Sequence, residues 1–117
     1  SALNNKEYYP KKEKGEKRKG YKTCYKRMEW DKPAPTITMR NDAISSQNNV
    51  HPGRLQKDGT YSDARVLTIK ELFILMSLPD NFILPDYLSD TEIRQILGEA
   101  IPPLLTRKIL EGIKIWN

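Results

Sequence analysis

The sequence has 117 residues, of which 38% are hydrophobic and 30% charged, a balance that suits one small domain with a modest core. No apolar run approaches the roughly 20 residues of a membrane-spanning helix, and no signal peptide is recognisable, so we expect a cytoplasmic protein with no membrane partner. One cysteine, Cys24, and one histidine, His51, exclude an intrachain disulfide and leave too few ligands for a zinc site. The sequence starts at Ser1 rather than at methionine, so we also expect the natural protein to extend upstream.

The net charge of +5 is concentrated in the N-terminal segment. Residues 1–30 contain ten Lys and Arg against four Glu, whereas residues 31–117 contain ten against eleven acidic residues. Such a segment attracts polyanions because its cations displace counterions from phosphates, but a solvated tail has the same composition. We interpret residues 1–24 as a basic, partly flexible segment, and composition leaves both roles open.

The next segment has the character of a small, irregular β region. Pro33 and Pro35 exclude a helix, and the alternation of Thr36-Ile37-Thr38-Met39 predicts a short strand. Residues 41–63 are rich in Asn, Ser, Asp and Gly and predict a long polar loop. Loops of roughly 20 residues inside a compact domain are usually functional or disordered.

Helix signals follow in the second half of the chain. Thr68 and Glu71 have capping-box spacing, the helix behind them carries its apolar face on Ile69, Leu72, Phe73 and Met76, and Pro79 is expected to stop it. A second capping box, Ser89 to Glu92, predicts a helix that runs to about Leu97 and is ended by Gly98. A third helix is expected from Pro102-Pro103, with an apolar stripe of Leu105, Ile109 and Ile113.

Three stretches together resemble the DNA cytosine-5 methyltransferases. Residues 27–37, Arg-Met-Glu-Trp-Asp-Lys-Pro-Ala-Pro-Thr-Ile, resemble the Arg-x-x-Trp-Asp-x-Pro-x-Pro-Thr segment at the end of the family's target-recognition region. Residues 51–82, with His-Pro, Arg-Val-Leu-Thr-x-x-Glu and Leu-Pro-Asp-Asn-Phe, resemble motif IX. Residues 96–105, Ile-Leu-Gly-Glu-Ala-Ile-Pro-Pro-Leu-Leu, resemble motif X.

The resemblance implies an α+β fold: a small recognition-lobe fragment with short strands and a long loop, followed by two to three C-terminal helices. The last helix would belong to the large, S-adenosylmethionine-dependent lobe. The implied divisions are residues 1–24, a basic segment; 25–66, the end of the target-recognition region; 67–97, the motif IX helix, a hinge and the following helix; and 98–117, the motif X loop and the C-terminal helix.

The implied activity is transfer of a methyl group from S-adenosylmethionine to C5 of cytosine in double-stranded DNA, in a restriction-modification system. The family's chemistry needs a Pro-Cys loop, a Glu-Asn-Val motif and a Phe-x-Gly-x-Gly cofactor loop, and none of these occurs in this sequence; Cys24 follows Thr23 rather than Pro. We therefore assign no catalytic residue and expect the fragment alone to be inactive. Its partner would be the N-terminal catalytic lobe, in the same chain or as a separate subunit.

The resemblance also implies roles for individual residues. Gly98, Glu99 and Ala100 would line an edge of the cofactor pocket, although Glu99 stands where the family has Asn and could repel the methionine carboxylate. The expected DNA contacts, each with a solvated surface charge as the alternative reading, are Lys26, Arg27, Arg40, His51 and Arg54. Arg65, Thr68 and Glu71 are expected to brace motif IX, and no residue is assigned to a metal.

Four other interpretations remain open from the sequence. The chain could be one subunit of a split enzyme, a stand-alone nucleic-acid-binding module, a piece of a tRNA cytosine methyltransferase, or a plain helical interaction domain. Whichever holds, the apolar stripe of the third helix would lack a partner in the isolated fragment. Because burying a Leu or Ile side chain contributes roughly 1.5–3 kcal/mol, we expect the fragment to dimerise or to swap this helix.

Overall fold

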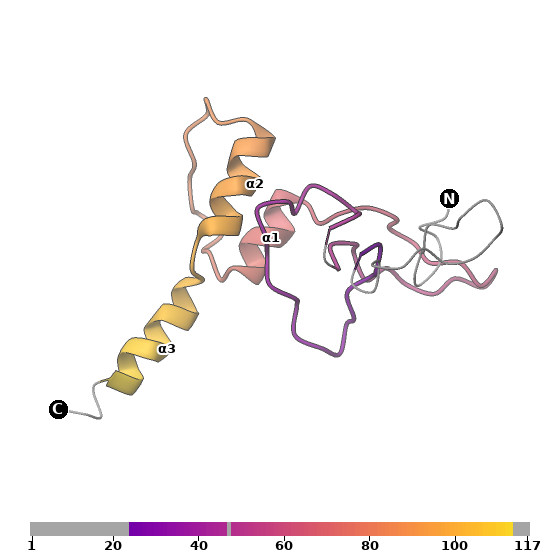
Figure 1. The fold of residues 1–117 in the computed structure, drawn as a ribbon, viewed down its shortest axis with the longest axis horizontal. Coiled ribbons are helices and arrows are strands. Elements are labelled where there is room, and N and C mark those ends of the chain that lie inside the picture. Colours follow the sequence, from indigo (N-terminus) through magenta and orange to yellow (C-terminus); the bar gives the residue numbers. More distant parts are fainter. Residues whose placement is uncertain (1–23, 47, 114–117) are drawn as a thin grey trace.

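The computed structural model describes residues 24–46 and 48–113, so the predicted basic segment of residues 1–24 lies outside the described part of the chain except for Cys24. The element order is α1 (Ile69–Leu75), α2 (Asp90–Glu99) and α3 (Pro103–Ile113). Helices α1 and α2 pack against each other, the irregular segment of residues 24–66 lies beside α1, and α3 extends away towards the C-terminus (Figure 1). None of the described helices is long and apolar enough to cross a membrane.

Helix α1 begins as the sequence predicts and ends earlier. The Thr68 side chain accepts from the Glu71 backbone N–H while the Glu71 carboxylate accepts from the Thr68 N–H, so the capping box is confirmed. The helix ends at Leu75, before Pro79, because Ser77 adopts a φ of +57° and the chain reverses there. The Leu78 N–H bonds to the Phe73 carbonyl at 2.9 Å and the Ser77 N–H to the Ile74 carbonyl at 3.0 Å, the pattern of a Schellman ending.

Helix α2 also has its predicted capping box, formed by Ser89 and Glu92. The prediction that Gly98 ends this helix is wrong, because the helix continues through Glu99 and Ala100 is its C-cap. Gly98 has a different reason to be glycine. A Cβ built on it would lie 2.5 Å from the backbone of Thr38 and Met39, so the glycine permits the close approach of that segment to α2.

Helix α3 begins at Pro103, as the Pro102-Pro103 pair predicts. Its first turn is attached to the end of α1, where the Leu104 N–H donates to the Ser77 hydroxyl at 3.1 Å. Beyond this contact no residue of α3 is buried. Leu105, Ile109 and Ile113 are between 52% and 54% exposed, so the apolar stripe has no partner within the described part of the chain.

The hydrophobic core lies between α1, α2 and the segment that precedes them. Its buried members are Met28, Leu67, Leu72, Met76 and Leu97. The half-buried side chains of Ile37, Ile69, Phe73, Leu78 and Ile93 pack around them. The core therefore joins the segment around Met28 to helices more than forty residues later in the chain.

Backbone pairing before α1 is sparse. Where both partners are described, the isolated bridges join Arg27 with Val50, Val50 with Val66 and Leu55 with Tyr61. The strand predicted at residues 36–39 does not form: residues 33–38 belong to no helix, strand or bridge, and a turn begins at residue 39. The α+β class of the whole fold stays a prediction.

The loop expected at residues 41–63 contains local structure. The 54–62 hairpin is closed by the Ser62 N–H, which donates to the Arg54 carbonyl at 3.0 Å, and by the Gln56–Thr60 bond of 2.8 Å. Its turn contains Gly59 at a φ of +82°, and the Asp58 carboxylate accepts from the Thr60 N–H at 3.0 Å. Short Asp-Gly turns of this kind are the local signal that the sequence interpretation missed.

Candidate functional site

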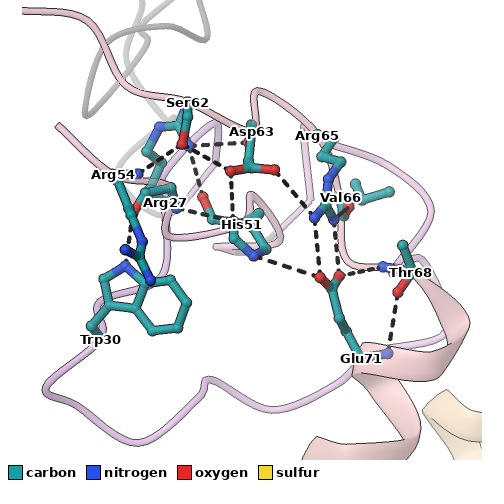
Figure 2. Close-up of polar contacts among 11 residues, drawn as sticks. Arg27, Trp30, His51, Arg54, Ser62, Asp63, Arg65, Val66, Thr68 and Glu71 are labelled. Atoms are coloured by element: carbon teal, nitrogen blue, oxygen red, sulfur yellow. Dashed lines mark hydrogen bonds and ion pairs between the residues drawn. The ribbon is translucent and has the colours of Figure 1, made fainter. Parts of the chain in front are cut away.

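A polar cluster joins the start of α1 to the loops before it, and Glu71 is at its centre (Figure 2). The Arg65 guanidinium donates to both oxygens of the Glu71 carboxylate, at 2.9 and 3.0 Å. The same carboxylate accepts from the Thr68 N–H at 2.7 Å. These charge-assisted bonds, the Arg65 bonds first among them, hold the pKa of Glu71 at about 2. One carboxylate thus caps α1 and fixes Arg65.

His51 lies beside the Glu71 carboxylate, with its side chain 13% exposed. Its Nδ1 accepts from the Gly53 N–H at 3.0 Å, which places the hydrogen of a neutral ring on Nε2. Nε2 faces the Glu71 Oε1 at 3.6 Å, and the His51 N–H donates to the Arg65 carbonyl at 2.8 Å. The imidazole therefore connects the loop at residues 51–53 to α1.

Arg27 is the innermost cation of the cluster, with only 7% of its surface exposed. Its Nη1 donates to the carbonyls of His51 at 2.8 Å and Asp63 at 3.1 Å, and its guanidinium lies 5.4 Å from the Tyr61 ring centroid. Burial lowers the pKa of Arg27, and the nearby Asp63 carboxylate opposes that effect. The guanidinium thus ties residues 51, 61 and 63 together from inside.

Gly53 is required where the chain passes Arg27. Its φ is +62°, and a Cβ there would lie 2.5 Å from the Arg27 Nη1 and closer still to the Ser62 carbonyl. Its carbonyl accepts from the Trp30 Nε1–H at 2.7 Å. The turn at residue 53 therefore connects the buried arginine to an exposed indole, because Trp30 is 67% exposed.

The predicted DNA contacts do not share one environment. Arg40 and Arg54 are exposed, Lys26 is half-buried, and Arg27 and His51 are enclosed in the cluster. The Arg40 side chain is 72% exposed and lies 3.2 Å from the Asp42 carboxylate. Among the described residues no carboxylate pairs with Arg54, whose N–H bonds to the Ser62 hydroxyl at 3.0 Å.

A second buried polar contact joins the loop after residue 38 to α2. The Asn41 amide donates to the carbonyls of Thr38 and Arg94, each at 2.8 Å, while the Arg94 Nη1 lies 3.3 Å from the Asn41 Oδ1. The Arg94 Nε donates to Asp90 at 2.8 Å. Asn41 and Arg94 are 3% and 8% exposed. Sequence reasoning missed both, because only their burial distinguishes them from surface Asn and Arg.

The predicted cofactor residues lie at the end of α2. Gly98 is half-buried and faces the Thr38–Met39 backbone, whereas Glu99 and Ala100 are exposed. The two exposed residues are the ones that this geometry leaves available to a ligand or to another part of the protein. Among residues 24–46 and 48–113 there is no group of His, Cys, Asp and Glu side chains that could hold a metal ion, and Cys24 is half-buried.

Comparison with known proteins identifies the family. The chain matches the C-5 cytosine-specific DNA methylase family over residues 2–115, and it therefore belongs to this family. It is 60% identical over 113 residues to the type II methyltransferase M1.HgaI of Avibacterium volantium, an alignment that covers 97% of this chain and 32% of the relative.

Two less similar relatives are also named as a type II methylase and a type II methyltransferase. The type II methylase M.HgiDII of Herpetosiphon aurantiacus is 33% identical over 89% of this chain and 27% of its own length. The type II methyltransferase M.AgeI of Thalassovita gelatinovora is 31% identical over 82% of this chain and 20% of its own length. The chain thus spans a third or less of these relatives, and no solved structure matches it.

Proposed function

We propose that this chain is the C-terminal part of a DNA (cytosine-5-)-methyltransferase of a restriction-modification system. The observation that carries the proposal is the family match over residues 2–115, in a sequence that has no Pro-Cys loop, Glu-Asn-Val motif or Phe-x-Gly-x-Gly loop. The chain would contribute DNA binding and an edge of the cofactor pocket, and the rest of the enzyme would supply the nucleophile. The chain by itself would be inactive.

The placement within the enzyme rests on the motif IX and motif X resemblance. Its support is that the motif IX residues Arg65, Thr68 and Glu71 form one connected brace at the start of α1. Residues with such a role position neighbouring loops without touching the substrate. We propose that this brace holds the 54–62 hairpin and the residue 51–53 turn in a fixed orientation towards DNA.

The five predicted DNA-contact residues differ in how exposed their side chains are. Arg54 and Arg40 have exposed side chains that can reach phosphates or base edges, and Arg40 would exchange its contact with the Asp42 carboxylate for a phosphate. Lys26 is half-buried. Arg27 and His51 would act indirectly, since their groups are engaged with main-chain atoms of the loops. Through these main-chain contacts, Arg27 and His51 would hold the backbone next to Arg54 in place.

For the cofactor, Glu99 and Ala100 are the proposed contact residues, and Gly98 would serve to dock α2 on the Thr38–Met39 backbone. S-adenosylmethionine is the methyl donor that the family membership implies. The Glu99 carboxylate would attract the positively charged sulfonium of the cofactor and repel the carboxylate of its methionine part. Glu99 would therefore restrict the orientation in which the cofactor binds at this edge of the pocket.

Complementation tests the proposal. The 117-residue chain is mixed with the N-terminal two thirds of the 60% identical relative, and transfer of a radiolabelled methyl group to DNA and to tRNA is measured. We expect the mixture to methylate DNA and neither protein to do so by itself. Replacing the cysteine of the Pro-Cys loop by alanine in the added lobe should abolish this activity. Methylation of tRNA alone would assign the tRNA branch, and DNA binding without any methylation would assign a stand-alone binding module.

A further inference from the structure

We propose that Trp30 is a stacking platform for an unpaired DNA base, in an open cavity between the indole and the 54–62 hairpin. This inference deepens the proposed function and rests on it, because it assumes that this face of the chain meets DNA. It adds a binding site to the part of the chain that the family resemblance treats only as the end of a recognition region.

The indole is both exposed and fixed. It is 67% exposed, yet its Nε1–H donates to the Gly53 carbonyl at 2.7 Å. The ring also meets the His51 imidazole edge-on, with centroids 5.7 Å apart and planes at 85°. A fixed aromatic ring binds a flat partner without losing further rotamer freedom, so these contacts prepare the exposed face for stacking.

The cavity beside the indole is lined by side chains that suit a nucleotide. Its volume of about 380 Å³ falls in the range of small-molecule sites. The hairpin side supplies Arg54, Leu55 and Tyr61, with Arg27 below them. A base stacked on Trp30 would place its phosphate towards the exposed Arg54, the combination of aromatic face and cation that binds single-stranded nucleic acid without sequence readout.

The lining is charged and polar as well as apolar, which suits a nucleotide better than an apolar protein segment. Glu29 and Asp31 also line the cavity, on the Trp30 side. The Glu29 carboxylate is paired with Lys32 at 3.0 Å, and a carboxylate such as Asp31 can accept from the exocyclic amino group of a base.

A second cavity, of about 280 Å³, also borders Trp30. Met28, Leu67, Ile74 and Leu75 make much of its wall apolar, and Glu29, Lys32, His51 and Glu71 complete it. Its lysine, Lys32, is paired with Glu29, and no arginine lines it to meet a phosphate. The site proposed for the base is therefore the first cavity, on the hairpin side.

Tryptophan fluorescence tests the site in the complete chain. The sequence has two tryptophans, Trp30 and Trp116, so a Trp116→Phe background leaves Trp30 as the one emitter. The chain is titrated with a single-stranded DNA oligonucleotide, with the perfect duplex, with a duplex that contains one central mismatch, and with RNA of the same sequence. Fluorescence anisotropy of labelled DNA reports binding independently of quenching.

We expect the single strand and the mismatched duplex to quench Trp30 more strongly than the perfect duplex. Trp30→Ala should weaken single-strand binding roughly five- to hundredfold, the change that one lost base-stacking contact produces. Trp30→Phe keeps a ring without the Gly53 hydrogen bond and should retain most of the affinity. Tyr87→Ala, at a side chain 84% exposed on the loop before α2, is the matched control and should change nothing.

For a chain that binds nucleic acid, three outcomes would overturn the site. They are DNA binding without Trp30 quenching, equal losses in Trp30→Ala and Trp30→Phe, and tighter binding of RNA than of DNA. Absence of DNA binding by the chain would also reject the site. The proposed function is judged separately, because methylation restored with the added lobe requires no quenching of Trp30. Thermal melts of both variants identify any loss caused by unfolding.

Discussion

Asn41 and Arg94 are reciprocal hydrogen-bond partners across 53 residues of sequence. The Asn41 amide donates to the Arg94 carbonyl at 2.8 Å, and the Arg94 guanidinium reaches back to the Asn41 side chain at 3.3 Å. The contact joins the loop that carries Arg40 to the helix that ends in Glu99 and Ala100. A proposed DNA-contacting loop and a proposed edge of the cofactor pocket are thus parts of one packed unit.

Asn41→Ala should destabilise the fold. The substitution removes the Asn41 donor from the half-buried carbonyl of Thr38 and the buried carbonyl of Arg94, which costs about 1–3 kcal/mol of unfolding free energy. Urea denaturation followed by circular dichroism measures the change. Asn81→Ala, at an exposed residue, is the control and should lie within about 0.5 kcal/mol of the original chain. Equal free energies of unfolding for the two variants would show that the Asn41 hydrogen bonds do not stabilise the packing of this loop on α2.

Gly98→Ala and Gly112→Ala should change stability in opposite directions. An alanine at residue 98 would lie 2.5 Å from the Met39 backbone nitrogen, whereas nothing lies within 4 Å of the position at Gly112. The crowded substitution should cost about 1–3 kcal/mol. The open one should stabilise α3 by up to about 1 kcal/mol, since alanine is the better helix former. If Gly98→Ala is neutral in thermal melts, the close approach to Thr38–Met39 is wrong.

The free energy of unfolding should decrease in acid because the Glu71 carboxylate becomes protonated. Its pKa in the fold is about 2, below its ordinary value near 4.5, so its ionised form stabilises the fold fully above that ordinary value. The contribution is lost as pH falls from about 4.5 to about 2. Glu71→Gln keeps a side chain that can accept in the capping box but loses the Arg65 ion pair. It should destabilise at pH 7 by about 1.5–3 kcal/mol.

The pH series for Glu71→Gln contains its own test. The difference between the variant and the original chain should shrink as pH approaches 2, because the original carboxyl is then becoming protonated. A difference that stays constant between pH 7 and pH 2 would show that Glu71 acts through something other than its charge. Glu99→Gln, at an exposed carboxylate, is the control and should lie within about 0.5 kcal/mol of the original chain at pH 7.

Arg54→Ala should weaken DNA binding and reduce its salt dependence. Each lost phosphate contact lowers the slope of log affinity against log salt by about 0.9. Arg107→Ala serves as the control, because Arg107 lies on α3 with its side chain 72% exposed. A slope that Arg54→Ala leaves unaltered would place the phosphate contacts elsewhere. Anisotropy titrations between low and physiological salt measure both slopes.

The isolated chain should self-associate through α3. Leu105 and Ile109 are 52% and 54% exposed on a helix with no buried residue, and burying each would contribute roughly 1.5–3 kcal/mol. Sedimentation velocity should show concentration-dependent dimers that a Leu105→Asp, Ile109→Glu double variant loses. A monomer at high concentration would contradict this expectation, and addition of the catalytic lobe should compete with the dimer if both cover the same face.

Local signals along the chain predicted the start of each helix and the identity of the family. The capping boxes at Thr68 and Ser89 and the proline at residue 103 act over a few residues, so their positions could be predicted without the fold. The ordered motif segments likewise predicted membership of the methylase family, which the match over residues 2–115 confirms.

Contacts between distant segments needed the tertiary structure. The sequence around Gly98 predicts the end of a helix, whereas the structure shows the Thr38–Met39 backbone packed against this glycine. Residues 36–39 alternate like a strand but pair with no strand in the described part of the chain. Arg27 and Arg54 are both arginines in a polar segment, yet one is enclosed by carbonyls and the other is exposed. Burial and partner geometry depend on residues tens of positions away, and these decide whether a charged side chain supports the fold or faces a ligand.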